Sequence, residues 1–180
     1  MLKGSLKISR KLLSSLISLW VERRGGFLIS NEVVRLSLLD VCLGLSLKVH
    51  GESINLDEVG VQSECKKLFN NESVDVDMVY VFLVRYRDEV TLEDYCRLYI
   101  LLGIFEFLCP SRKRTIFPIF FTIVDDLSSL RKYNWGGLVY EYLVGSICNA
   151  SMFLMEKGNK RHFHIVGCVY LLHVIHNQFL

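Results

Sequence analysis

The chain has 180 residues, of which 51% are hydrophobic, 12% aromatic and 22% charged, and only two are prolines. This composition excludes a disordered, collagen-like or low-complexity protein, and the length suits one domain with a sizeable core. The formal net charge of +2 excludes a uniformly acidic or basic protein.

The charges are unevenly distributed along the chain. Residues 1–24 hold six basic residues and one acid, residues 52–94 hold four basic residues and eleven acids, and residues 97–180 hold nine basic residues and five acids. A basic start before an acidic middle suggests pairing within the chain or with a partner. The simpler interpretation is that these charged faces are solvated.

The six cysteines are irregularly spaced and form no CxxC pair. Four of them, Cys42, Cys96, Cys148 and Cys168, lie within apolar runs, as buried free thiols do. This pattern predicts a reducing compartment, either cytosol or nucleus.

The first 20 residues are basic, rich in Ser and Leu and free of acids, which resembles an organelle presequence. The alternative is an amphipathic first helix whose apolar side chains face a core. We expect no membrane span, because a span needs about 20 apolar residues. Residues 142–155 are too few, and residues 162–180 carry four histidines, so both runs are predicted to be buried helices.

The first predicted element is a helix over residues 10–23, which Gly25-Gly26 ends. The segments Phe27–Ile29 and Val33–Arg35 then flank a short polar turn, and this pattern predicts a small β-hairpin.

The next segment predicts two short helices and one ambiguous element. Ser37 and Asp40 form a capping box that opens a helix ending near Gly44. A second helix is expected over residues 58–70. The β-branched residues of 76–86 favour a strand, whereas the length and neighbours of the segment favour a helix.

A second capping box, Thr91–Asp94, opens a helix that runs to about Leu108. This helix is apolar nearly all round, so we expect it to be central and buried. Pro118 begins a further helix that is expected to reach Leu130.

Asn134 is expected to cap a helix that runs from Trp135 to about Ser151. There Gly136 would let the next helix approach closely while the indole ring packs back. A last helix is expected from about Phe163 to the end of the chain.

Two further glycines, Gly103 and Gly167, stand where helices could cross tightly. Because helix dominates, the fold is predicted to be mainly α, an irregular multi-helix bundle with a small N-terminal β-hairpin. We expect a basic tail over residues 1–9 and a single helical domain over residues 10–180.

Several sequence blocks follow one another in an order that is informative only when they are taken together. They are Leu16–Arg23 with Phe27-Leu28, Ser37–Leu45, Arg97–Gly103, Asp125–Leu127 with Tyr133–Gly136 and Glu141–Leu143, and Gly167-Cys168 with Leu171-Leu172. Over roughly residues 12–175 this order resembles the plant mobile domain family, also called main-like or "aminotransferase-like" plant proteins, which is related to domains carried in plant transposons.

The chain departs from that family at several positions. His173 and Ile175 stand where the family usually has Gln and Trp, and Ser46 stands where a Pro is usual. The chain also stops at Leu180 inside an apolar helix, so we expect a truncated copy.

The resemblance implies a non-enzymatic nuclear protein-interaction module with a role in gene silencing, gene expression and meristem development. Its partner would be an unidentified protein, bound through an apolar groove or face. One alternative is a transposon-derived nucleic-acid-binding module. Another is an organelle-targeted soluble helical protein from which residues 1–24 are cleaved.

Basic residues in two segments are the candidates for contact with nucleic-acid phosphates. They are Arg112, Lys113, Arg114, Lys157, Lys160 and Arg161. The nearby aromatic residues Phe117, Phe120 and Phe121 are interpreted as core residues rather than as a stacking platform.

No cofactor or metal is expected. Pyridoxal phosphate requires a Schiff-base lysine and a phosphate cup, and the sequence has neither a glycine-rich phosphate loop nor a lysine in an apolar setting. Aminotransferase activity is therefore not expected. The C-terminal group of His162, His164, Cys168, His173 and His176 lacks the spacing of a structural zinc site.

No catalytic residue is expected either. Asp125-Asp126 would need further carboxylates to form the metal site of a nuclease, and the pair is interpreted as solvated acids at a helix end. No motif places a cysteine beside a histidine, as nucleophilic catalysis would require.

Overall fold

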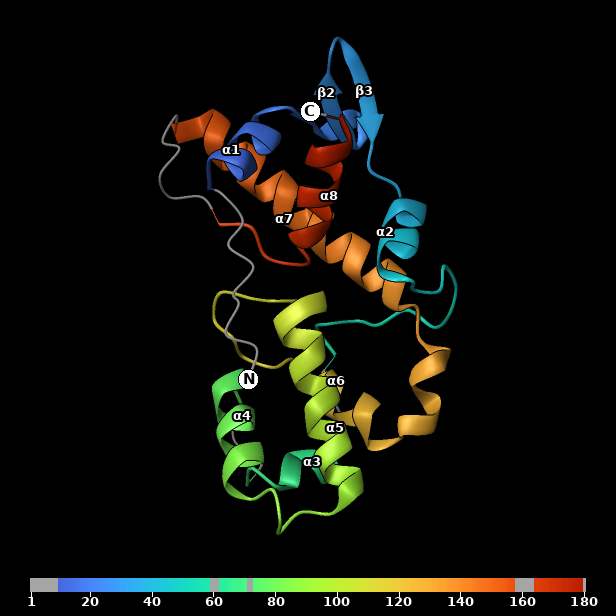
Figure 1. The fold of residues 1–180 in the computed structure, drawn as a ribbon, viewed down its shortest axis with the longest axis vertical. Coiled ribbons are helices and arrows are strands. Elements are labelled where there is room, and N and C mark those ends of the chain that lie inside the picture. Colours follow the sequence, from blue (N-terminus) through green and yellow to red (C-terminus); the bar gives the residue numbers. More distant parts are fainter. Residues whose placement is uncertain (1–9, 59–61, 71–72, 158–163, 180) are drawn as a thin grey trace. The chain divides into compact units, whose positions relative to one another are not determined.

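A computed structural model describes residues 10–58, 62–70, 73–157 and 164–179. The basic tail predicted for residues 1–9 lies outside this range. By their internal contacts the residues form two compact units (Figure 1). Unit 1 consists of the residues up to Val49 and those from Gly136 onward, and unit 2 is the continuous segment His50–Trp135.

Unit 1 contains the small sheet and four α-helices. Its elements are α1 (Arg10–Ser18), β1 (Trp20–Val21), the 3₁₀ turn η1 (Glu22–Arg24), β2 (Gly26–Ile29), β3 (Glu32–Arg35), α2 (Leu38–Leu45), α7 (Trp135–Lys157) and α8 (Tyr170–Phe179).

Unit 2 contains four α-helices and two segments of other helical type. Its elements are α3 (Glu64–Lys67), α4 (Val76–Arg85), α5 (Leu92–Gly103), the π-helical segment η2 (Ile104–Leu108), α6 (Pro118–Asp125) and the 3₁₀ segment η3 (Leu127–Lys132). The mainly α fold class is thereby confirmed.

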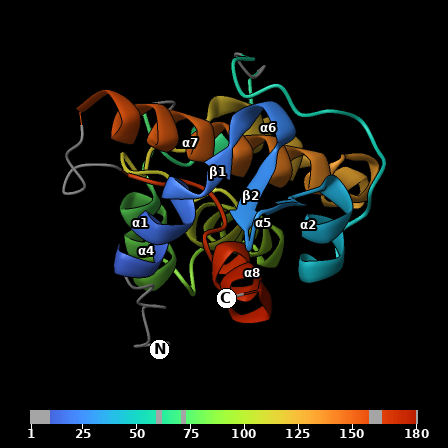
Figure 2. The same ribbon diagram turned by 90° about the horizontal axis from the view of Figure 1, so that it is seen from above.

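The predicted hairpin forms, and it gains a third strand. The strand order is β1-β2-β3, all antiparallel, and Figure 2 shows β1 and β2 side by side. Ser30 and Asn31 have φ values of 48° and 70°, as a two-residue hairpin turn requires. The helix predicted over residues 10–23 ends at Ser18, because Trp20 pairs with Phe27 and their rings pack edge to face at 5.0 Å.

The capping box at α2 forms as predicted. The Ser37 N–H donates to the Asp40 carboxylate over 2.8 Å, and the Asp40 N–H donates to Ser37 Oγ over 3.3 Å. The helix ends at Leu45, one residue after the Gly44 near which its end was expected, and Ser46 is the capping residue. Ser46 takes the left-handed conformation at its C-terminus, with φ of 54°, and a Cβ on Gly44 would lie 2.9 Å from the side chain of Leu171 on α8.

The core of unit 1 is built by α1, α7 and α8, and α1 packs against α8 (Figure 1). Their fully buried side chains include Leu16, Ile17, Val139, Leu143, Ile147 and Leu172. Two glycines permit close approaches here. A Cβ on Gly136 would meet the sulfur of Cys42. A Cβ on Gly167, which has a φ of 92°, would lie 3.2 Å from the Cα of Leu143.

By length and composition alone, α7 could cross a membrane over Trp135–Met155. Buried core helices of this length and composition also meet this criterion for a membrane span. In this structure α7 carries buried core residues of unit 1, among them Val139 and Leu143. The final helix, α8, begins at Tyr170 rather than near Phe163.

In unit 2 the ambiguous segment 76–86 is a helix, and two predicted helices are shorter than expected. The helix expected over residues 58–70 is limited to α3, and the helix expected to reach Leu130 ends at Asp125. The second break has a local cause, because the Asp126 side chain accepts the N–H of Ser128 and begins η3 instead.

Candidate functional site

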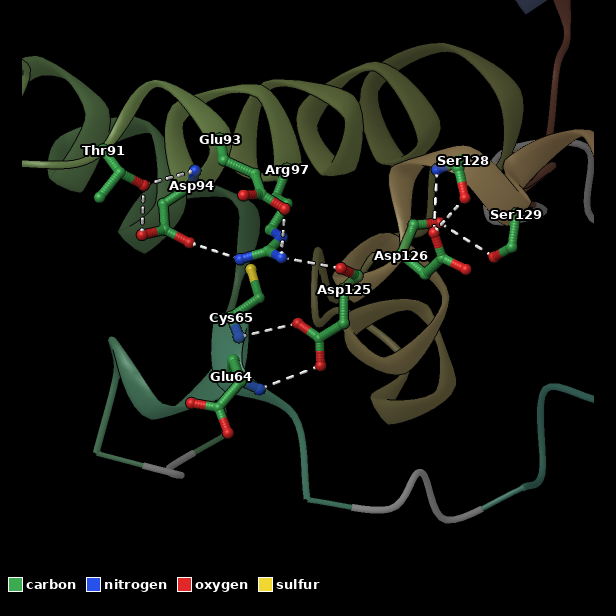
Figure 3. A network of polar contacts seen from close by, with 10 residues as sticks. All are labelled: Glu64, Cys65, Thr91, Glu93, Asp94, Arg97, Asp125, Asp126, Ser128 and Ser129. Atoms are coloured by element: carbon green, nitrogen blue, oxygen red, sulfur yellow. Dashed lines mark hydrogen bonds and ion pairs between the residues drawn. The ribbon is translucent and has the colours of Figure 1, made fainter.

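A network of polar side chains joins α3, α5 and α6 in unit 2 (Figure 3). At its centre, Arg97 of α5 forms ion pairs with Asp94 over 2.8 Å and with Glu93 over 2.7 Å. The same guanidinium group donates to the main-chain oxygen of Asp125 over 2.8 Å. The Arg97 side chain is only 15% exposed, so its charge is balanced where water has little access.

Asp125 caps the first turn of α3. Its carboxylate accepts the N–H of Glu64 over 3.0 Å and the N–H of Cys65 over 2.9 Å, and both amides belong to the N-terminal turn of that helix. The carboxylate therefore satisfies two donors that a short helix leaves unpaired.

Asp126, in contrast, caps the start of η3. Its carboxylate accepts the N–H of Ser128 over 3.0 Å and the Ser128 hydroxyl over 2.6 Å. The hydrogen bond from the Ser128 hydroxyl has the largest effect on this carboxyl group and lowers the pKa of Asp126. Figure 3 shows the carboxylates of Asp125 and Asp126 directed to different elements. The interpretation of both as simply solvated acids is thus wrong for Asp125, because its carboxylate caps α3.

The thiol of Cys65 lies beside this network and is fully buried. Burial, helped by the negative charge of Asp125, raises the pKa of Cys65 to about 12. A thiol with such a pKa is protonated at neutral pH and is a poor nucleophile. The contacts of the network join three helices, α3, α5 and α6.

The basic loop between η2 and α6 holds three of the candidate residues for phosphate contact. Arg114 is 42% exposed but is already paired with carboxylates of the chain. Its guanidinium group donates to Asp77 of α4 over 3.2 and 3.0 Å and to Glu106 of η2 over 2.6 Å. Arg114 thereby fixes the loop to two neighbouring elements.

Arg112 and Lys113 are exposed, and neither side chain forms an ion pair with a residue that the structure describes. Lys157 is the last residue of α7, in unit 1, and its side chain is not described. Lys160 and Arg161 lie outside the described residues. Among the candidates, the structure therefore offers Arg112 and Lys113 as available cations.

The cavities lined by described residues include two that open at the surface. The first, of about 250 Å³, lies in the basic loop and is lined by Ser111, Arg112, Lys113, Thr115, Ile116, Phe117 and Pro118. The second, of about 340 Å³, is lined by Glu141, Tyr142, Gly145, Ser146, Asn149, His164 and Val166 of unit 1. Ser146 Oγ accepts the N–H of Val166 over 2.8 Å, which fixes one wall of the second cavity.

No group of three or more histidine, cysteine, aspartate or glutamate side chains gathers as a metal site among the residues that the structure describes. Of the C-terminal group, His162 lies outside these residues and the side chain of His176 is not described. Cys168 is buried, and burial raises the pKa of its thiol.

The outer face of α5 was not anticipated from the sequence. The prediction of a central, buried helix is correct for one side only. Leu98 and Leu101 are fully buried, whereas Leu92 is 80% exposed, Tyr99 65% and Phe107, in the following η2, 43%. Gly103 is exposed between the two aromatic residues, and a Cβ placed on it would meet nothing within 4 Å. The expectation of a tight helix crossing at Gly103 is therefore also wrong.

The spacing of these residues places them on one helical face, since Leu92, Tyr99 and Gly103 are separated by seven and four positions. The charged residues of α5 lie elsewhere on the helix: Glu93 and Asp94 pair with Arg97. The sequence predicts a helix here, but apolar residues occur on nearly every side of it. Their pattern therefore does not indicate which of them face solvent.

Comparisons with known proteins give one match. A family model described as "Domain of unknown function (DUF8566)" matches residues 2–173. No curated protein and no solved structure matches the chain.

This match corrects the resemblance to plant mobile domain proteins, which the comparisons do not detect. The blocks that suggested that family are short and mostly structural: Ser37 and Asp40 cap a helix, and Trp135 packs on Phe120 at 6.1 Å between ring centres. The nuclear location and developmental role that rested on the resemblance lose that support. With 172 of its residues matched by one family model, the chain belongs to the DUF8566 family.

Proposed function

We propose that this protein is a non-catalytic interaction module that binds a partner protein through the outer face of α5. The observation that carries the proposal is the exposure of Leu92, Tyr99 and Phe107, of which Leu92 and Tyr99 are both more than half accessible to solvent. Large apolar side chains clustered on one exposed face are typical of protein interaction sites.

The shape of this face supports a helical partner. Gly103 leaves open space between Tyr99 and Phe107: apart from its chain neighbours and the backbone of its own helix, nothing would lie within 4 Å of a Cβ there. A bulky residue of a partner helix fits such a gap, and a tyrosine beside it is a good anchor because it loses little conformational freedom on binding.

The charged side chains beside this face are already paired within the chain, which supports an apolar contact. The ions of α5 are occupied in the network with Arg97, and Glu106 of η2 pairs with Arg114. Glu93 and Glu106 remain 62% and 51% exposed, but each is paired with an arginine of the chain. A partner that covers Leu92 and Tyr99 therefore need not supply a counter-charge, and burial of these apolar side chains is favourable.

Selection from a displayed library of amphipathic helical peptides tests the proposal. Peptides enriched on the full chain are expected to bind the variant Tyr99→Glu at least tenfold more weakly, because the substitution places a charge in the apolar contact. The matched control is Leu43→Glu, which changes a leucine that is 72% exposed on α2 in unit 1. Both variants should keep the circular dichroism spectrum of the parent.

Two results would contradict the proposal. One is that no helical peptide is enriched above the background of the empty support. The other is that the enriched peptides bind Tyr99→Glu as well as they bind the parent while losing affinity for Leu43→Glu, which would place the binding site on the other unit.

A further inference from the structure

The basic loop has a fixed backbone, and this is unusual for an exposed connection between helices. The N–H of Val76 donates to the Arg114 oxygen over 2.9 Å, and the N–H of Ile116 donates to the Val74 oxygen over 3.0 Å. Arg114 itself has a φ of 56° and is held through its side chain by Asp77 and Glu106. The loop is therefore preorganised, so a ligand that binds it loses little affinity to ordering the loop.

This arrangement separates the roles of three consecutive basic residues. Arg114 is neutralised by two carboxylates, whereas Arg112 and Lys113 occupy the middle of a turn closed by the Arg114 N–H and the Ser111 oxygen at 3.4 Å. Their side chains are exposed and form no ion pair with the residues described. Two adjacent cations on a rigid turn are suited to bind an anion such as a phosphate group.

The cavity beside these cations has an apolar lining. Both Arg112 and Lys113 contribute to it, and so do Ile116, Phe117 and Pro118. The Phe117 ring lies 6.0 Å from Phe105 and 6.4 Å from Phe120 by ring centres, which holds it in place. With about 250 Å³, the cavity is smaller than the usual site of a drug-sized ligand and suits a single planar ring.

The start of α6 adds to the positive potential at the same place. Pro118 both lines the cavity and begins α6, and no side chain caps this helix at Phe117. The N-terminus of a helix carries a partial positive charge that favours a nearby anion.

From the fixed loop, the two available cations and the adjoining apolar cavity, we propose that this loop binds a nucleoside phosphate. Arg112 and Lys113 would bind the phosphate, and the base would enter the cavity against Ile116, Phe117 and Pro118. A nucleoside phosphate is presented both by a free nucleotide and by single-stranded nucleic acid, in which the bases are accessible. The site is distinct from the outer face of α5 and does not depend on it.

Fluorescence anisotropy with the full chain tests this inference. The probes are a labelled 12-residue oligothymidylate, an abasic oligomer of the same length and charge, and AMP as an unlabelled competitor. We expect the oligothymidylate to bind about fivefold or more tightly than the abasic oligomer, the factor expected from one stacked base. Competition by AMP would identify free nucleotide as a sufficient ligand, and its absence would identify the strand as the source.

Two double variants provide the comparison. Arg112→Ala with Lys113→Ala should weaken binding about tenfold or more and should lower the slope of log affinity against log salt concentration by about 0.7, for the loss of one neutralised phosphate on a single strand. Arg131→Ala with Lys132→Ala removes the same charge from an exposed pair at the end of η3 and should leave both quantities nearly unchanged.

Three results would overturn the inference. Equal affinity for the thymidylate and abasic oligomers would show that the cavity takes no base. Equal losses in the two double variants would show that overall charge alone attracts the strand. Binding to vesicles that contain an anionic phospholipid, without binding to any of the three probes, would assign the loop to a membrane surface instead.

Discussion

Asp125 shows how one side chain can hold two distant segments together. Its carboxylate accepts two amides at the start of α3, which are 60 and 61 positions away in the sequence. Its main-chain oxygen meanwhile accepts a hydrogen bond from Arg97. The residue therefore links α6 to both α3 and α5.

Replacement of this carboxylate should destabilise the fold. We expect Asp125→Asn to lower the free energy of unfolding by about 1–2 kcal/mol, because an amide retains one acceptor oxygen for two N–H donors. Urea unfolding followed by circular dichroism measures the change. Asp57→Asn is the control, since it removes the same charge from an exposed loop position, and equal losses in the two variants would contradict this role of Asp125.

The cysteines should differ in reactivity according to their burial. At pH 8 we expect iodoacetamide to modify the partly exposed Cys96 and Cys148 before the buried Cys65, whose pKa is raised to about 12. Peptide mass spectrometry of timed samples measures the order. All six thiols should react together in denaturant, and modification of native Cys65 as fast as Cys96 would refute the expected protection.

The same pKa shift predicts how stability changes in alkaline solution. The unfolded chain loses the Cys65 proton near the ordinary thiol pKa of 9.0, whereas the folded chain keeps it until about 12. The contribution of this thiol to the free energy of unfolding is fully present below pH 9 and is lost as the pH rises from 9 to about 12. Replacement of Cys65 by Ala should therefore flatten the alkaline decline of the unfolding free energy, measured by urea titration between pH 8 and 11.

Single elements were predictable where their determinants are close in sequence. The capping box of Ser37 and Asp40 and the hairpin depend on residues within about ten positions of each other, and both form. At the second predicted box, Thr91 caps the helix by accepting the Asp94 N–H, and its hydroxyl donates to the Asp94 carboxylate. The helix expected over residues 10–23 failed because Trp20 pairs with Phe27, a contact that depends on the folded sheet.

The candidate site was only partly predictable, for the same reason. The exposure of Arg112 and Lys113 agrees with their position in a polar run, but the engagement of Arg114 depends on Asp77, 37 positions away. No local pattern marks which residue of a basic run is paired. The outer face of α5 was also hidden, since an apolar residue that faces solvent has the same side chain as one in the core.

Two helical glycines should respond in opposite ways to replacement. Gly103 has ordinary helical angles and open space, so Gly103→Ala should raise the free energy of unfolding by up to about 1 kcal/mol. Gly136→Ala should lower it, because the new Cβ would meet the sulfur of Cys42 and lie 2.7 Å from the Lys48 oxygen. Thermal unfolding of both variants measures the signs, and a shared sign would contradict these opposite environments.

At the scale of the molecule, the two units differ in charge and in chain continuity. Unit 2 holds fourteen acidic and ten basic residues, whereas the remainder of the chain holds five acidic and eleven basic residues. Unit 2 is one continuous segment and has its own buried residues, including Leu98, Leu101 and Phe120. The sequence showed the difference in charge, while the prediction of a single domain over residues 10–180 stays open.

Excision of unit 2 provides the test of that prediction. We expect the fragment 50–135 to fold on its own into a helical structure, because its core residues and the Arg97 network all lie within it. A cooperative urea transition and dispersed amide resonances would support independent folding. A fragment without either would favour the single domain predicted from the sequence.

The two ends of unit 2 are bonded to each other. The Glu52 N–H donates to the Lys132 oxygen and the Asn134 N–H donates to the Glu52 oxygen, each over 2.8 Å. Residues near the first and last positions of unit 2 are therefore within hydrogen-bonding distance of each other. A chain with such adjoining ends is suited to circular permutation. A short peptide can join the ends near residues 52 and 134, and new termini can be opened in the exposed turn around Asp88. The order of the helices in the sequence would then change, while their packing within the unit would be retained.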